Sequence, residues 1–257
     1  MKTRWASNPI HGSSYEETIE YRGITVKVSA SVPARINIIG EHTDHFGGLS
    51  LTFSSQHRLK LTASTREDGI RGNQTVISLW EASGGWSADL DVDSNIPIGA
   101  GLSSSAALCV AIVMCSQNSI DPMETSLEAQ RIENQVLRSN CGLMDQISIT
   151  HSKEGIATLL DFSRMSIEDF RIPDDWRFKL VDTGIRRSLS ETNYSSSEIK
   201  IGTRRIHAKD ESARVRAALS SDARALGTIL NESHASISNI IRASTPEIDN
   251  IVKEIQN

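Results

Sequence analysis

Apolar and polar positions alternate along two stretches near the start of the chain. Residues 24–32, ITVKVSASV, place apolar side chains at nearly every second position, which predicts a half-buried β-strand. Residues 35–40, RINIIG, predict a second strand, and residues 58–65 and 74–82 predict two more of the same antiparallel meander. A β-sheet is therefore expected in the first part of the chain.

The pattern changes after residue 105, where apolar residues run on without alternation. Residues 106–115, AALCVAIVMC, predict a buried helix by their length and by the absence of a period of two. Residues 122–140 predict an amphipathic helix, whose apolar side is expected to contain Leu127, Ile132, Val136 and Leu137. A further helix is predicted after Cys141.

The last part of the chain combines both patterns. Residues 155–162 and 177–184 predict strands, and from Ser195 onward the pattern is mostly helical. We place a domain boundary near residue 175, so that residues 1–175 and 176–257 form the two predicted domains. Two modest domains agree with a length of 257 residues.

Charge and composition exclude some classes of partner. The chain has 27 basic and 32 acidic residues, a net charge of −5, and no run of Lys or Arg, so a nucleic-acid partner is not expected. No stretch approaches the roughly 20 apolar residues of a membrane span, so no membrane partner is expected either. Cys109, Cys115 and Cys141 cannot all pair, which predicts a reducing compartment, the cytoplasm.

A loop rich in glycine and serine directly precedes the predicted buried helix. A helix N-terminus presents unpaired N–H groups and a positive dipole, so phosphate is a natural ligand there. The alternative is a simple N-cap in a tight turn, and these residues alone leave both interpretations open. The loop lacks the Gly-Lys-Ser/Thr ending of a P-loop and the third glycine of a dinucleotide fingerprint. The residues concerned are Gly99, Ala100, Gly101, Leu102, Ser103, Ser104 and Ser105.

Residues 37–48, NIIGEHTDHFGG, place two carboxylates, two imidazoles and a closing Gly-Gly directly after an apolar strand. A zinc site of His42, Asp44 and His45 is one interpretation. Three ligands within four residues do not easily surround a tetrahedral ion, so we disfavour it.

Two of these segments resemble a known family. PIGAGLSSSAAL, residues 97–108, resembles the phosphate-binding motif of the GHMP kinases, and RINIIGEHTDHFGG, residues 35–48, resembles the more specific galactokinase signature. Residues 141–148, 188–197 and 230–255 resemble later galactokinase segments in the same order. The likeness therefore extends over nearly the whole chain.

The resemblance implies an α+β fold of two domains. The N-terminal domain would contain a left-handed β-α-β crossover, and the C-terminal domain would be ferredoxin-like. The third family motif, which is rich in glycine, does not occur in these 257 residues, so we expect the C-terminal domain to be truncated.

The resemblance also implies roles for individual residues. Asp145 would be the general base and Arg35 its neighbour, while Ser105 and Glu133 would hold Mg²⁺ and residues 99–105 the phosphates of ATP. From the residues alone, an N-cap would be the preferred interpretation of Asp145 and a solvated helix residue that of Glu133. The residues that would bind the sugar are Glu41, His42, Thr43, Asp44 and Tyr194.

The expected activity is the ATP-dependent phosphorylation of galactose at its C1 hydroxyl, so the partners would be a small sugar and ATP. His45 favours galacturonate as an alternative substrate, because galacturonokinases have an Asp-His pair there. Glu41 argues against it, because a carboxylate aimed at C6 would repel a substrate carboxylate. A sugar sensor without turnover and an inactive fragment are further alternatives.

Overall fold

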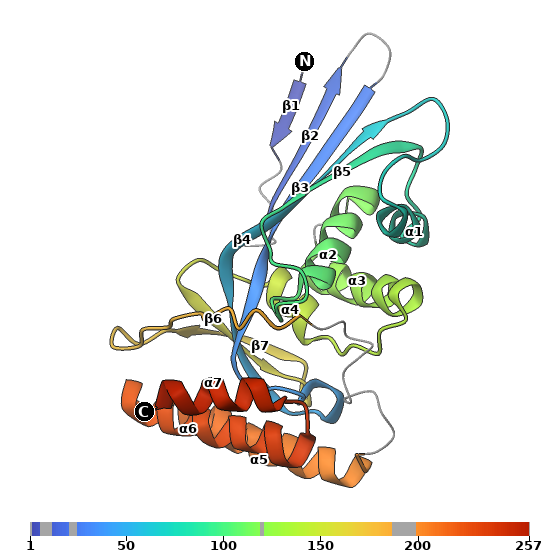
Figure 1. Cartoon of the computed structure of the whole chain (residues 1–257). Coiled ribbons are helices and arrows are strands. Elements are labelled where there is room, and N and C mark those ends of the chain that lie inside the picture. The colour runs from blue at the N-terminus through green and yellow to red at the C-terminus, as the bar shows by residue number, and fades with distance from the viewer. Residues whose placement is uncertain (1, 6–11, 21–24, 119–120, 187–198, 257) are drawn as a thin grey trace. The chain divides into compact units, whose positions relative to one another are not determined.

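A computed structural model of the chain describes residues 2–5, 12–20, 25–118, 121–186 and 199–256 (Figure 1). The chain forms two compact units. The first unit contains residues 1–36 and 53–154, and the second contains residues 37–52 and 155–257. Two long strands, β3 and β4, each contribute residues to both units.

The sheet of the first unit is antiparallel. Strands β2 and β3 pair with Tyr15 opposite Ala30, and β4 pairs with β5 with Ala63 opposite Leu90. The predicted strands at 24–32 and 35–40 are one continuous strand, because Pro33 and Ala34 continue the extended backbone between them. The strands are β1 (Lys2–Trp5), β2 (Ser14–Glu20), β3 (Thr25–Ile39), β4 (Leu49–Thr65) and β5 (Ala88–Ser94).

Four helices pack beside these strands (Figure 1): α1 (Gln74–Ala82), α2 (Ser104–Gln117), α3 (Pro122–Leu137) and α4 (Met144–Thr150). The strand predicted over residues 74–82 is wrong, because this segment is helix α1. Asn73 caps the helix by accepting a hydrogen bond from the Thr75 amide. The buried side chains Val76, Leu79 and Trp80 follow the i, i+3, i+4 spacing of one helix face.

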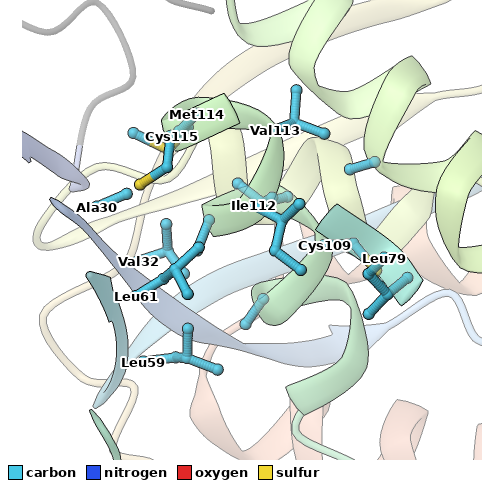
Figure 2. Packing of buried hydrophobic residues seen from close by; sticks show 14 of the residues in the cluster. Ala30, Val32, Leu59, Leu61, Leu79, Cys109, Ile112, Val113, Met114 and Cys115 are labelled. Carbon is cyan, nitrogen blue, oxygen red and sulfur yellow. The ribbon is translucent and has the colours of Figure 1, made fainter. Parts of the chain in front are cut away.

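Helix α2 is the centre of the hydrophobic core, as residues 106–115 predicted. Its side chains are buried on all sides, and Ile112 lies near Val32 and Leu61 of the sheet (Figure 2). Burial of one such side chain contributes about 1.5–3 kcal/mol. Cys109 and Cys115 are free thiols inside this core, and burial raises the pKa of both.

Helix α3 confirms the predicted amphipathic helix but not its full apolar side. Leu127 is 48% exposed, whereas small and polar residues share the buried face with Ile132. No single helix of the described segments is long and apolar enough to cross a membrane; α2 and α3 pass that test only together, across a bend of 114°.

The second unit combines the start of β4 with two further strands and a group of helices. Strand β4 pairs with β6 with Leu49 opposite Asp161, and β6 pairs with β7 with Ala157 opposite Phe170. The elements are β6 (Ile156–Asp161), β7 (Ser166–Arg171), α5 (Ile201–Ala218), α6 (Ala223–Ser236), the π-helical turn η4 (Ile237–Ile241) and α7 (Pro246–Gln256). The predicted strand at 155–162 and the helical region are confirmed over the described residues.

One prediction differs from the structure here. The strand predicted over residues 177–184 is wrong: the segment has no regular structure, and Phe178, Leu180 and Val181 remain exposed. The two compact units interleave along the chain, and the division into domains at residues 1–175 and 176–257 stays a prediction. Residues 37–52 are part of the second unit, together with β6 and α5.

Candidate active site

The side chains of Arg35 and Asp145 form an ion pair in the first unit. Nε of Arg35 donates to Oδ1 of Asp145 at 2.8 Å, and Nη2 contacts the same oxygen. The second carboxylate oxygen, Oδ2, accepts a hydrogen bond of 2.7 Å from the hydroxyl of Ser103. Both oxygens of the predicted catalytic carboxylate are therefore held by predicted site residues.

The positions of these side chains follow from the local structure. Arg35 is a buried residue of β3, and its Nη1 also lies 3.4 Å from the carbonyl oxygen of Gly101. Asp145 lies in the first turn of α4, whose N-cap is Leu143, so the N-cap interpretation of Asp145 is wrong. The Asp145 side chain is 29% exposed, so one side of the carboxylate is accessible.

The glycine-rich loop turns sharply before helix α2. Gly99 and Gly101 have φ angles of 70° and 77°, which only glycine adopts without strain. Ser103 has a φ of 59° and occupies the N-cap position, but its side chain makes no capping hydrogen bond. Because the Ser103 hydroxyl donates to Asp145 instead, the simple N-cap interpretation does not describe it.

The glycine-rich loop has one buried residue, and its other residues are accessible. Leu102 is buried and fixes the loop to the core. A Cβ added at Gly101 would meet no atom within 4 Å, so space remains beside the backbone there. The six other residues of the predicted set retain some exposure: Gly99, Ala100, Gly101, Ser103, Ser104 and Ser105. This geometry suits a ligand that approaches the backbone closely.

A second carboxylate lies beside this loop. Oε1 of Glu133 accepts a hydrogen bond of 2.7 Å from Ser105, and its Oε2 accepts one of 2.7 Å from Gln146. Glu133 is only 2% exposed, so it is not a solvated helix residue. Burial raises the pKa of this carboxyl above 4.5, although the bonds from Ser105 and Gln146 oppose the shift.

Glu133 and Ser105 are oxygen donors, which suit a hard cation such as Mg²⁺. A buried carboxylate also favours a cation nearby, because a positive charge offsets the cost of burying the negative one. Within the described segments, no group of three or more His, Cys, Asp or Glu side chains is placed to hold a metal. Such a cation would therefore take most of its ligands from water or from a phosphate. The zinc interpretation of residues 42–45 has no support.

The predicted sugar-binding segment lies in the second unit, between β3 and β4. Thr43 is fully buried, and its hydroxyl lies within 3.1 Å of the carbonyl oxygens of Gly40 and Leu49 and 2.9 Å from Ser50 Oγ. We infer that Thr43 holds the loop closed. The short helix η1 (Asp44–Phe46) follows it.

Glu41, His42 and Asp44 of this loop are partly exposed. Burial lowers the pKa of His42 to about 4, despite the opposing effect of Asp44, so the imidazole is neutral near pH 7. Oδ1 of Asp44 accepts from the amide of His45, whose side chain is exposed. The carbonyl of Glu41 lies 3.0 Å from Nε2 of His207. Tyr194 lies outside the described residues.

Sequence reasoning missed several residues of these sites. Gln146 follows Asp145 directly and holds Glu133, and its Oε1 is buried without a described partner. Three residues of helix α5, which are distant in the sequence, contact the loop between β3 and β4: His207, Glu211 and Ser212. The helical spacing of 207, 211 and 212 on one face was the available signal.

A cavity of about 560 Å³ lies elsewhere in the first unit. It is lined by Tyr15, Trp86 and Cys115 among others, and contains none of the predicted site residues. Cys115 is near the end of α2, a helix of 14 residues, which is about 21 Å long. The cavity is therefore distant from Ser103 and Ser105.

The chain is similar to known proteins in sequence and in fold. Residues 73–153 match the family model of the GHMP kinases N terminal domain, and residues 14–64 match that of the galactokinase galactose-binding signature. A structure of Lactococcus lactis galactokinase complexed with galactose is similar, with a TM-score of 0.70 and 21% identity over 89% of this chain and 79% of that chain.

Other GHMP kinases share the fold. Methanococcus jannaschii mevalonate kinase has a TM-score of 0.61 and 14% identity over 88% of this chain and 82% of that chain. A D-glycero-D-manno-heptose 1-phosphate kinase from Bacteriodes thetaiotaomicron has a TM-score of 0.52 and 16% identity over 81% of this chain and 79% of that chain. The chain thus has the α+β GHMP kinase fold, and residues 73–153 match the N-terminal domain of the GHMP kinases. Within this class it is galactokinase-like, because it carries the galactose-binding signature.

Proposed function

We propose that this protein phosphorylates galactose at the C1 hydroxyl, with ATP as phosphate donor and Mg²⁺ as cofactor. The observation that carries the proposal is the Asp145 carboxylate, held by Arg35 and Ser103 beside a glycine-rich loop. The match of residues 14–64 to the galactose-binding signature supports the choice of sugar. Three free cysteines support a cytoplasmic location.

Asp145 would act as the general base. Its Oδ2 is bonded to the Ser103 hydroxyl, and a sugar hydroxyl can take the place of that donor. The C1 hydroxyl would give its proton to Asp145 as its oxygen bonds to the γ-phosphorus. The bond from that phosphorus to the bridging oxygen breaks, and ADP leaves. Arg35 would keep the carboxylate in place and stabilise negative charge nearby.

Residues 99–105 would bind the phosphates, and the N-terminus of α2 would add its dipole. Ser105 and Glu133 would hold Mg²⁺, which supplies positive charge to the phosphates. The raised pKa of Glu133 supports this assignment, since a cation would offset the cost of burying its charge.

In the second unit, Glu41, His42 and Asp44 would bind the sugar hydroxyls, with Tyr194 as a further predicted contact. Carboxylates accept hydrogen bonds from hydroxyls, and the neutral imidazole of His42 can donate or accept. Thr43 would support them, because its own hydroxyl is used inside the loop.

The test is turnover with a panel of acceptors. The protein is incubated with ATP, Mg²⁺ and either galactose, glucose, galacturonate or mevalonate, and ADP release and the phosphorylated product are measured. Galactose 1-phosphate as the main product is expected. Faster turnover of galacturonate or mevalonate would reject galactose, and sugar binding without ADP release would favour a sensor.

A further inference from the structure

Helix α5 contacts the backbone at both ends of the loop that contains Glu41, His42 and Asp44. The amide of Gly40 donates to Oε1 of Glu211 at 3.1 Å. The carbonyl oxygen of Glu41 lies 3.0 Å from Nε2 of His207. At the other end, the amide of Leu49 donates to Oγ of Ser212 at 3.0 Å. These contacts join segments 163 to 171 residues apart.

The three helix residues are buried and held by further partners. Glu211 is 0% exposed and also accepts from Ser233 at 2.6 Å and from Nε of Arg214 at 2.7 Å. Because the carbonyl of Glu41 only accepts, Nε2 of His207 must carry the proton. Nδ1 then accepts from the hydroxyl of Ser236, 2.8 Å away. This arrangement fixes both the tautomer and the ring.

The backbone of the loop leaves little freedom around these contacts. Gly40 has a φ of 103°, and a Cβ there would lie 2.4 Å from the carbonyl oxygen of Leu49. A Cβ at Gly48 would lie 2.8 Å from Oγ of Ser212. The two glycines therefore allow β3, β4 and α5 to approach closely, and a movement of α5 would displace the loop.

We propose that Glu211, His207 and Ser212 are positioning residues that fix the loop backbone, and through it the side chains of Glu41 and His42, for binding of the sugar. This inference rests on the proposed function for the identity of the sugar. The backbone groups of Gly40 and Glu41 are hydrogen-bonded to α5. The helix therefore fixes the backbone position from which the Glu41 side chain extends. A positioning error of about 1 Å costs on the order of a hundredfold in rate.

The main test compares Glu211→Gln with Asp210→Asn, a matched change at an exposed position of the same helix. Glu211→Gln keeps the shape but leaves one of the three donors at this site without an acceptor. We expect the KM for galactose to rise roughly tenfold or more, while the KM for ATP changes less than about twofold. Asp210→Asn should leave both unchanged. Equal changes in both KM values, or none, would overturn the proposal.

A second pair of variants keeps the test decisive if Glu211→Gln folds poorly. His207→Gln retains an N–H that can reach the carbonyl of Glu41, whereas His207→Leu removes it. We expect His207→Gln to retain a KM for galactose within about threefold of wild type, and His207→Leu to exceed tenfold. Equal behaviour of the two variants would show that the hydrogen bond has no positioning role.

Amide hydrogen exchange separates this inference from the proposed function. Exchange of the Gly40 amide should become faster in Glu211→Gln, and that of the Leu49 amide in Ser212→Ala, while amides of α2 stay protected. Unchanged exchange at both sites would refute the contacts with α5. If the wild-type protein does not phosphorylate galactose, the proposed function fails, and these exchange rates still decide whether α5 holds the loop.

Discussion

The hydroxyl of Ser103 donates a hydrogen bond of 2.7 Å to Oδ2 of Asp145, although 42 residues separate them in the sequence. A serine at the start of a helix normally caps its own backbone, and here it contacts the carboxylate on α4 instead. The glycine-rich loop and the predicted base are therefore coupled directly. The roles of Asp145 and of the other predicted site residues can be tested by mutation.

Replacement of Asp145 by Asn should abolish most of the phosphoryl transfer. The amide has the same shape but cannot take up the proton of the sugar hydroxyl, and general base catalysis contributes about 10²–10⁴-fold. We expect kcat to fall by at least about a hundredfold, with the affinity for galactose retained. Turnover and calorimetric sugar binding are measured, with Asp93→Asn, an exposed change on β5, as the control. A variant that keeps most of the wild-type kcat would exclude Asp145 as the base.

Arg35→Lys tests whether the geometry of the ion pair matters beyond its charge. The guanidinium contacts Asp145 through two nitrogens and approaches the carbonyl of Gly101 with the third. A lysine ammonium cannot make these planar contacts together. We expect kcat to fall roughly tenfold or more, while the circular dichroism spectrum is unchanged. Wild-type kinetics would mean that positive charge alone is sufficient.

Glu133→Gln should make the metal-free protein at least as stable as wild type near pH 7. The pKa of Glu133 is raised in the folded protein, so this group favours folding most at low pH and loses that contribution as the pH rises above 4.5. A glutamine avoids this cost, and it can still bond to Ser105 and Gln146. Thermal unfolding at several pH values measures the effect.

The Glu133→Gln variant also tests whether a cation binds at Glu133. Addition of Mg²⁺ with a nucleotide should raise the melting temperature of the wild type more than that of Glu133→Gln, because a cation stabilises only the carboxylate. Glu124→Gln, a change in the same helix, serves as the control. Equal Mg²⁺ responses in both proteins would contradict the predicted metal site.

His42 should make stability depend on pH in the acidic range. Its pKa is lowered to about 4 in the folded protein, so between pH 6.5 and 4 the unfolded chain takes up a proton that the folded one does not. Stability is therefore lost as the pH falls through this window, by up to about 3 kcal/mol. Denaturant unfolding at pH 7, 6, 5 and 4.5 should show this loss in the wild type.

The His42→Gln variant should show a flatter profile over the same range. His45→Gln is the control, because His45 is exposed in the same loop and its removal should leave the loss of stability in place. Identical slopes for wild type and His42→Gln would show that the pKa of this imidazole is not lowered in the folded protein.

Glu41 should discriminate against an acidic sugar. A carboxylate repels the carboxylate of galacturonate, so wild type should prefer galactose by at least roughly tenfold in kcat/KM. In Glu41→Ala the ratio should shift toward galacturonate, because the repulsion is removed and the contact to galactose is lost. An unchanged ratio would remove Glu41 from the sugar site.

Elements with a strong local pattern could be predicted from the amino-acid sequence. A continuous apolar run made α2 a buried helix, and glycines before it predicted a turn with a close backbone approach. The resemblance of residues 35–48 and 97–108 to the galactokinase and GHMP motifs agrees with the family models that match residues 14–64 and 73–153. These features depend on neighbouring residues and therefore appear in the sequence directly.

Features that depend on distant partners could not be predicted in this way and became visible in the folded chain. Residues 74–82 contain β-branched and aromatic side chains typical of a strand, yet the cap at Asn73 and the packing of Trp80 make them a helix. Residues 177–184 have a strand pattern but pair with no described strand. The contacts of Glu211 with Gly40, and of Ser103 with Asp145, join residues 171 and 42 positions apart. No local pattern encodes such distances, because the folding of the whole chain brings the partners together.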